Sequence, residues 1–345
     1  MNRIETRRPA PRGRALSASA LGRRALLGLA AVASLVGTGG VHAQSDKPIK
    51  LLVGFPPGGA SDRVARLLAE KLRPLLKQPV VVENKPGVGG RIAAQAVKAA
   101  PADGLTLMVA PNATFVFQHL TYPVSVLGYD MTTDFTSVAR INAYPMAMVV
   151  QASTGVKSAK DYVAWRKTPA GQPTFGTAGM GGDTHFNGLQ FGKAAGVEMT
   201  VVPYRGNGPL INELLGGQIL SGNMVAGDAI QHVKAGKLNY VGVFARQRSA
   251  LLPDVPTMAE QGFDTGGDNG WMGMWGPRGL PAPVLQRLQG ALQTVLTSPE
   301  VKTLMMNQFL QVPDYRPGAQ VDADLKAELA HWGPVIQASG FKPNK

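Results

Sequence analysis

Residues 49–72 read IKLLVGFPPGGASDRVARLLAEKL and join a strand-like run to a helix-like run through a Gly/Pro turn. Residues 49–55 are mostly aliphatic and end at the turn, where Gly58 and Gly59 allow the backbone to reverse sharply. After the turn, apolar residues recur at helical spacing and form one face: Val64, Leu67, Leu68 and Leu72. The stretch predicts one β-turn-α unit, with polar side chains such as Arg63 turned away from the core.

The same alternation of strand and helix continues along the chain. Further strands are expected at 79–83, 105–110, 146–150, 174–177, 198–204, 219–225, 240–244 and 271–276. This pattern predicts an α/β fold with two lobes, each a mostly parallel sheet flanked by helices, with a cleft between them. We expect the first lobe at residues 45–145 plus 268–345 and the second at 146–267.

The first 44 residues have the layout of an export signal. They hold seven Arg and one Glu, then the apolar run ALLGLAAVASLV at 25–36 and a small-residue cleavage site ending at Ala43. The adjacent arginines Arg23 and Arg24 fit a twin-arginine signal, and they also fit an ordinary Sec signal. We expect a periplasmic protein, and removing residues 1–44 lowers the net charge from +13 to +7.

Composition and motifs argue against several function classes. The chain has no cysteine, its basic residues are dispersed, and no Walker, G-x-S-x-G or H-E-x-x-H motif occurs. The histidines after the signal lack metal-ligand spacing. We therefore expect no enzyme activity, no metal, no cofactor and no nucleic-acid partner.

A second glycine-rich loop, GTAGMGGDTH at 176–185, has the same layout as the first. Both loops follow strands and precede helices, at the position where ligands bind in open α/β sheets. Ser61 is expected to cap the first helix, and Asp183 or Thr184 the second. The free N–H groups of two helix starts favour an anion, although either loop alone can be an ordinary turn.

Ordered segments of the chain resemble the tripartite tricarboxylate transporter substrate-binding proteins, the Bug family. They follow the export signal and lie at 55–72, 80–108, 175–185, 201–219, 232–238 and 251–263. The resemblance implies a two-lobed, type II periplasmic binding protein fold with a hinge. It also implies a small carboxylate as ligand, held partly by backbone amides of loops that correspond here to residues 55–62 and 177–185.

The resemblance and the two loops together define a set of candidate ligand-binding residues. They are Phe55, Pro57, Gly58, Gly59, Ala60, Ser61, Asp62, Thr177, Gly179, Met180, Gly181, Gly182, Asp183, Thr184, His185, Tyr204 and Asn223. The family pattern is broken at Gly182, where Ser or Thr is common, and near Asn223, where an acidic residue is often found. Specificity in the second lobe is therefore open.

For several residues the sequence leaves two roles open. Asp62 either pairs with Arg66 one helical turn away or receives a cationic group of the ligand. Arg205 either binds a second ligand carboxylate or has a surface or hinge role. The turn NKPGVGG at 84–90 is expected to support the first loop from behind. Four residues are candidates for an apolar wall or for the core: Phe115, Phe117, Met180 and Met224.

The function predicted from the sequence is capture of a small organic carboxylate by lobe closure about hinges near Met146 and Gly266. A monomer would then deliver the ligand to membrane transporter subunits. A sensor that presents the bound carboxylate to a membrane receptor is the alternative. An exported hydrolase using His185 with Asp183 or Ser61 is the third hypothesis, and it requires a nucleophile and a base within hydrogen-bond reach.

Overall fold

The fold is built on two β-sheets. The computed structural model describes residues 47–342, so the signal peptide predicted for residues 1–44 lies outside the described residues. The six-stranded sheet has the order β11 (Val312–Pro317), β4 (Phe135–Tyr144), β10 (Gly270–Pro277), β3 (Thr106–Pro111), β1 (Ile49–Val53), β2 (Val80–Asn84). The five-stranded sheet has the order β7 (Thr200–Pro203), β6 (Thr174–Thr177), β8 (Ser221–Val225), β5 (Met146–Gln151), β9 (Leu238–Val243).

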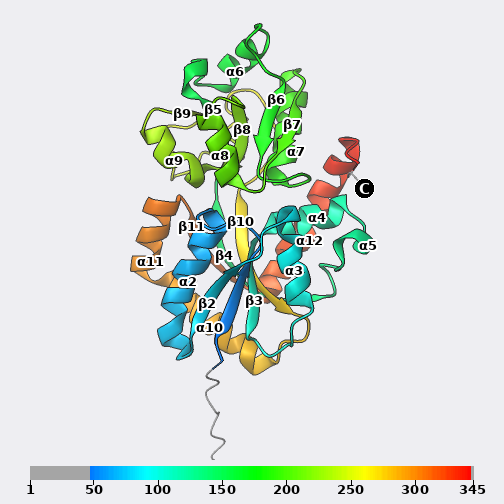
Figure 1. The fold of residues 1–345 in the computed structure, drawn as a ribbon, viewed down its shortest axis with the longest axis vertical. Helices are drawn as coiled ribbons and strands as arrows, with labels where there is room; N and C mark the ends of the chain where they lie inside the picture. The colour runs from blue at the N-terminus through cyan, green and yellow to red at the C-terminus, as the bar shows by residue number, and fades with distance from the viewer. Residues whose placement is uncertain (1–46, 343–345) are drawn as a thin grey trace, which may run out of the picture. The chain divides into compact units, whose positions relative to one another are not determined.

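Each sheet carries its own helices, and we call each sheet with its helices a lobe (Figure 1). The first lobe has α2 (Ala60–Leu76), α3 (Arg91–Lys98), α4 (Val116–Thr121), α5 (Val124–Leu127), α10 (Ala282–Thr297), α11 (Pro299–Leu304) and α12 (Gly318–Ala338). The second has α6 (Ala159–Arg166), α7 (Asp183–Ala195), α8 (Asn207–Leu215) and α9 (Ala226–Lys234). Short 3-10 helices are η1 (Val88–Gly90), η2 (Asn112–Thr114) and η3 (Ala152–Thr154), and η4 (Met305–Phe309) is a π-helix.

The predicted α/β class is confirmed, but the sheets are mixed. β1 is parallel to β2 and β3, and β6 is parallel to β7 and β8, whereas β10 and β5 are antiparallel to both of their neighbours. β5 starts directly after the chain leaves β4, and β10 starts after the return segment 244–269. A strand that enters its sheet from the other lobe starts at the edge where the parallel strands end, so it runs against them.

The first strand and helix show how the sequence pattern produces the core. The apolar face predicted for α2 is buried, with exposures of 0% at Val64, 6% at Leu67, 0% at Leu68 and 1% at Leu72. Each such side chain contributes about 1.5 to 3 kcal/mol when buried. The helix begins at Ala60 with Gly59 as N-cap, so the expected cap at Ser61 is wrong. Gly58 makes the preceding turn, at φ 88°.

Two strands were not predicted, and tertiary contacts explain both. β4 carries Arg140 and Asn142 in its middle, and β11 carries Pro313 and Pro317, so neither reads as a strand. β11 lies at the sheet edge, where a missing N–H is tolerated. Asn142 Nδ2 donates to Gln311 Oε1 at 2.6 Å.

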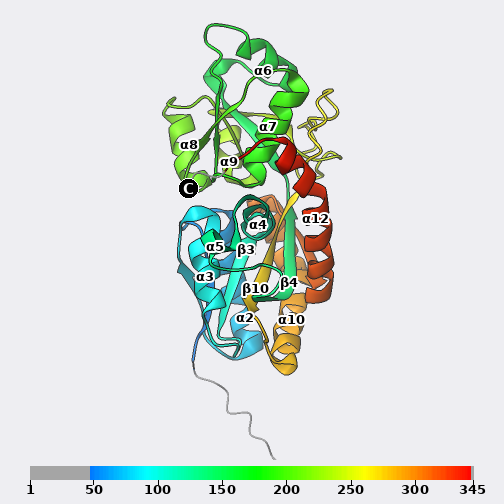
Figure 2. The same ribbon diagram turned by 90° about the vertical axis from the view of Figure 1, so that its right-hand side faces the viewer.

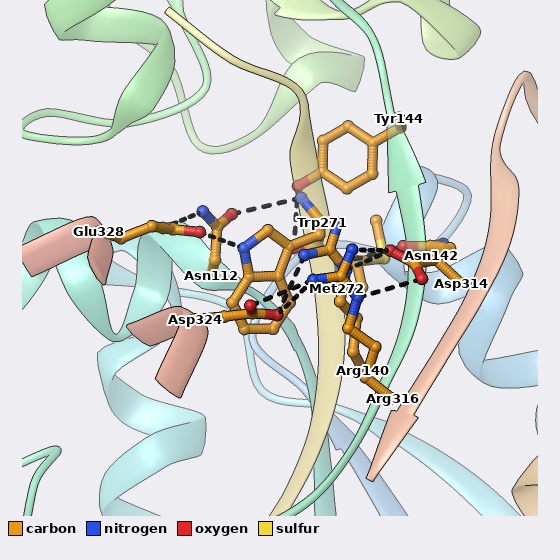
Figure 3. Close-up of polar contacts among 10 residues, drawn as sticks. All are labelled: Asn112, Arg140, Asn142, Tyr144, Trp271, Met272, Asp314, Arg316, Asp324 and Glu328. Atoms are coloured by element: carbon orange, nitrogen blue, oxygen red, sulfur yellow. Dashed lines mark hydrogen bonds and ion pairs between the residues drawn. The ribbon is translucent and has the colours of Figure 1, made fainter. Parts of the chain in front are cut away.

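Partly buried charges bind β4 to β11 and α12 (Figure 3). Arg140 Nε lies 2.9 Å from an Asp314 oxygen, and Arg140 Nη1 lies 3.3 Å from Asp324, which also pairs with Arg316. Burial lowers the pKa of Arg140, although the two carboxylates act in the opposite direction. Figure 2 shows α12 running along this side of the first lobe.

A close backbone contact positions the first glycine loop. A Cβ on Gly54 would lie 2.4 Å from Cα of Gly90, which is backbone and cannot rotate away. Asn84 Nδ2 donates to the Phe55 carbonyl at 3.0 Å and to Asp62 Oδ1 at 2.9 Å. The turn at 84–90 therefore packs behind the loop that follows β1.

We predict that Gly54→Ala lowers the free energy of unfolding by about 1 to 3 kcal/mol, because two backbone segments must separate. Urea denaturation of residues 45–345 measures this change. Gly290→Ala is the matched control: Gly290 is exposed within α10 and has no heavy atom within 4 Å of an added Cβ. This control should be neutral or stabilising by up to about 1 kcal/mol. Equal stability of the two variants would contradict the packing argument.

Candidate functional site: an interlobe cleft

A cleft of about 340 Å³ opens between the two sheets and is lined from both. The first lobe contributes the loop after β1 and the start of α2, together with Pro111, Tyr144 and Met272. The second lobe contributes the loop between β6 and α7 and the starts of α8 and α9. Helix N-termini from both lobes therefore converge on one cavity, where their first-turn N–H groups and helix dipoles favour an anion.

Most of the residues proposed from the sequence meet at this cleft. Eleven of them line it: Phe55, Pro57, Gly58, Gly59, Ala60, Ser61, Gly179, Met180, Gly182, Asp183 and Thr184. Six do not: Asp62, Thr177, Gly181, His185, Tyr204 and Asn223. Tyr204 lines a smaller adjoining hollow of about 180 Å³, together with Arg205.

Asp62 is engaged by the protein itself. Its carboxylate accepts hydrogen bonds of 2.9 Å from the Gly58 amide, Arg66 Nε and Asn84 Nδ2, and Asp62 is 2% exposed. Burial raises the pKa of Asp62, but the hydrogen bonds from Arg66, Gly58 and Asn84 outweigh it and hold the pKa below its ordinary value. The geometry agrees with the structural role, in which Asp62 closes the first loop.

The second loop is also held by side chains that do not line the cleft. The Gly181 amide donates to His185 Nδ1 at 3.0 Å, and Gly181 has a φ of 70°, which favours glycine. Asn223 Nδ2 donates to the Thr184 carbonyl at 3.1 Å, and the hydroxyls of Thr177 and Thr184 are hydrogen-bonded. Thr177, His185 and Asn223 therefore hold the loop from behind, whereas Thr184 also lines the cleft.

His185 lies in an aromatic environment rather than in the cleft. Its ring stacks on Phe186 at a centroid distance of 5.0 Å and meets the edge of Phe341 at 5.2 Å. Figure 2 shows the C-terminal segment after α12 approaching α7 at this point. Burial lowers the pKa of His185 to about 4, so the ring is neutral at pH 7, and Nδ1 already accepts the Gly181 N–H.

Asp183 supplies a carboxylate at the start of α7. Its Oδ1 accepts the Thr184 N–H at 2.7 Å, so this side chain satisfies one of the helix's own first-turn donors. Burial raises the pKa of Asp183 to about 6, with the backbone hydrogen bonds acting in the opposite direction. The start of α7 therefore carries a carboxyl group of its own, which already accepts one of the helix's N–H groups.

The sequence reasoning missed a third helix start and an ion pair. Gly206, at φ 107°, precedes α8, and the stretch GNGP at 206–209 has the same strand-turn-helix layout as the other loops. Asn207 lines the cleft there, as do Arg63 and Asp228, which form an ion pair of 2.7 Å. The glycine spacing could have indicated the helix start, but the Arg63–Asp228 contact joins residues 165 positions apart.

The apolar-wall hypothesis is wrong for three of its four residues. Phe115 and Phe117 are 1% exposed and Met224 is 0% exposed, and all three belong to hydrophobic cores. Met180 does line the cleft, and so does Gly89 of the turn at 84–90. That turn therefore supports the first loop and also reaches the cavity.

The floor of the cleft is fixed by a polar network behind it (Figure 3). Tyr144 and Met272 line the cavity, and the Met272 amide donates to Asn142 Oδ1 at 3.0 Å. Trp271 Nε1 donates to Glu328, and Asn112 Nδ2 donates to the same carboxylate at 2.7 Å. Burial raises the pKa of Glu328, and the two donors partly offset that effect.

Within residues 47–342, no helix combines the length and apolar character needed to cross a membrane. The same residues contain no cluster of three His, Cys, Asp or Glu side chains arranged to hold a metal ion.

Comparison with known proteins identifies the family. The family model described as the tripartite tricarboxylate transporter family receptor matches residues 64–341. The chain belongs to this family. Bordetella pertussis protein BugT is 29% identical and covers 91% of this chain and 98% of its own length. A UPF0065 protein from the TAR-I ttuE-ttuC' intergenic region of Agrobacterium vitis is 34% identical over 85% of this chain and 84% of its own.

Two solved structures of Rhodopseudomonas palustris proteins share the fold. One, solved with adipate, has a TM-score of 0.81 and 28% identity, covering 86% of this chain and 98% of its own. The other, MatC with bound malate, has a TM-score of 0.77 and 27% identity, covering 84% of this chain and 98% of its own. The resemblance to the tripartite tricarboxylate transporter substrate-binding proteins, predicted from the sequence, is confirmed. The predicted two-lobed fold is confirmed as well.

We predict that Asp183→Asn changes how stability depends on pH. The pKa of Asp183 is about 6 in the folded protein and 3.8 in the reference state, so its ionisation costs stability as the pH rises from about 4 to 6. The asparagine variant should gain roughly 2 to 3 kcal/mol relative to wild type between pH 4 and pH 7. His185 changes stability in the opposite sense, because its lowered pKa makes the folded state lose stability as the pH falls from 6.5 toward about 4.

Urea denaturation of both proteins at several pH values isolates the Asp183 contribution, because His185 is common to both. A constant difference in unfolding free energy from pH 4 to pH 7 would show that the Asp183 carboxyl is not shifted as described.

Proposed function

We propose that this chain is a periplasmic solute-binding protein that captures a small organic carboxylate and delivers it to a tripartite tricarboxylate-type membrane transporter. The observation that carries the proposal is the convergence of the α2, α7 and α8 N-termini on one interlobe cleft. Such termini bind a carboxylate through backbone N–H groups and the helix dipole. The adipate-bound and malate-bound structures with the same fold support this ligand class.

We propose that the chain is exported to the periplasm, that residues 1–44 are a cleaved signal peptide, and that the protein is a monomer there. We further propose that residues 45–145 plus 268–345 form the first lobe and residues 146–267 form the second. The membership of the strands in the two sheets supports these boundaries, because the chain crosses between sheets at Pro145 and in the segment 244–269. These two crossings are the proposed hinges for closure on the ligand.

The family description as a transporter receptor supports delivery to a transporter rather than to a sensory receptor. The hydrolase hypothesis lacks support in the cleft geometry. His185 is 2% exposed, its Nδ1 accepts the Gly181 amide, and the residue does not line the cavity. We propose binding without bond making or breaking.

We predict that at least one carboxylate raises the melting temperature of residues 45–345. A ligand at about 100 times its dissociation constant stabilises the folded state by about 2.7 kcal/mol, which thermal-shift measurements detect. The panel should span mono-, di- and tricarboxylates, acidic amino acids and aromatic acids. The absence of any shift across the panel would refute the proposed function.

We also predict that Gly182→Val abolishes this shift while the protein stays folded. Gly182 lines the cleft, has an extended φ of −103°, and has no heavy atom within 4 Å of an added Cβ, so the new side chain should project into the cavity. Gly290→Ala, outside the cleft, should keep wild-type affinity. If Gly182→Val binds as well as wild type, the ligand site lies elsewhere.

A further inference from the structure

An ion pair bridges the two lobes inside the cleft. Arg63 Nη2, on α2 of the first lobe, lies 2.7 Å from Asp228 Oδ1, in the first turn of α9 of the second lobe. The Asp228 side chain is 5% exposed and that of Arg63 is 30% exposed. Both residues line the cavity. The pair therefore contributes charged side chains to the same space that the proposed ligand occupies.

The Asp228 carboxylate has several donors in addition to Arg63. Asn207 Nδ2 donates to Oδ2 at 2.7 Å, and the Ala60 amide at the start of α2 also donates to this carboxylate. Burial raises the pKa of Asp228, and the interactions with Arg63 and Asn207 partly offset this effect. An internal carboxylate thus already occupies one first-turn amide of α2 and the guanidinium beside it.

The charged side chains that line the cleft leave no unpaired cation among the described residues. They are Arg63, Asp183 and Asp228. Arg63 faces Asp228, and Asp183 is a buried carboxyl at the start of α7. A second ligand carboxylate would have to compete with Asp228 for Arg63 or lie near Asp183, and juxtaposed like charges are unfavourable at a desolvated site.

The remaining surface of the cavity suits an apolar or hydrogen-bonding ligand body. Phe55, Pro111, Met180, Ile211 and Met272 line it. Two polar atoms next to the ion pair are buried without a hydrogen-bond partner in the described part of the chain: Arg63 Nε and Asn207 Oδ1. They form one donor and one acceptor of the kind that a hydroxyl, amide or ring nitrogen satisfies.

We propose that the Arg63–Asp228 pair determines ligand charge, so that the cleft selects an organic anion with one carboxylate and an uncharged remainder, and disfavours di- and tricarboxylates. This inference rests on the proposed function, because it specifies the ligand class of the same site. It separates this chain from the two structural neighbours, which hold the dicarboxylates malate and adipate.

Isothermal titration calorimetry on residues 45–345 tests the inference with ligand pairs matched in length, such as hexanoate against adipate and 4-methylbenzoate against terephthalate. We expect the monocarboxylate of at least one pair to bind at least about tenfold more tightly than its dicarboxylate, because the second charge finds no free cation. Tighter or equal binding of the dicarboxylate in every pair that binds would overturn the inference and leave the proposed function intact. No binding by any carboxylate would overturn both.

Variants test whether the ion pair is the cause. Asp228→Asn frees the Arg63 charge and should improve dicarboxylate affinity at least about tenfold relative to the monocarboxylate. Arg63→Gln combined with Asp228→Asn should remove that gain. Glu300→Gln is the matched control, because it removes one negative charge from an exposed pair with Lys71 outside the cleft, and it should keep the wild-type preference.

Two results would show that the Arg63–Asp228 pair does not determine the ligand charge. One is a folded Asp228→Asn protein whose preference is unchanged. The other is that Arg205→Ala changes the preference between mono- and dicarboxylate while the Arg63 and Asp228 variants do not. Arg205 lines the adjoining hollow, so this result would place the charge selection there. Circular dichroism establishes whether each variant is folded. If Asp228→Asn does not fold, the wild-type preference measured with the matched ligands still decides the inference.

Discussion

The cleft depends on one backbone constraint: parallel strands end at the same edge of a sheet, so the helices that follow them begin there. β1 leads into α2, β6 into α7, and β7 into α8, and all three helix starts line the same cavity. The peptide dipoles and first-turn N–H groups of these helices favour an anion, and no lysine within residues 47–342 lines the cavity. The main chain that the fold aligns therefore supplies the attraction for an anion that the proposed function requires.

The protein balances part of this positive potential with its own carboxylates. Asp183 accepts the Thr184 amide at the start of α7, and Asp228 accepts the Ala60 amide and the Arg63 guanidinium at the start of α2. A buried carboxylate needs such donors, since its desolvation is costly otherwise. In the structure described here, side chains thus already occupy two of the helix starts, and the proposed ligand must bind beside them.

A supporting layer behind the cleft keeps the loops in place. Gly54 and Gly90 allow two backbone segments to touch. Asp62 accepts the Gly58 amide of the first loop, and Asn84 donates to the Phe55 carbonyl and to Asp62. On the second lobe, His185 accepts the Gly181 amide and Asn223 donates to the Thr184 carbonyl. Asp62, Gly181, His185 and Asn223 were all proposed from the sequence, and they hold the loops without lining the cleft.

The sequence alone determined the α/β class, the positions of most strands, and the two glycine loops, because hydrophobic periodicity and Gly/Pro turns act over a few residues. It did not reveal β4 or β11, because Arg140 and Pro313 become acceptable in strands only through a distant carboxylate and an edge position. Tertiary structure alone decided which loop residues line the cleft. It also brought Arg63 to Asp228, because a contact across 165 positions of chain leaves no local pattern.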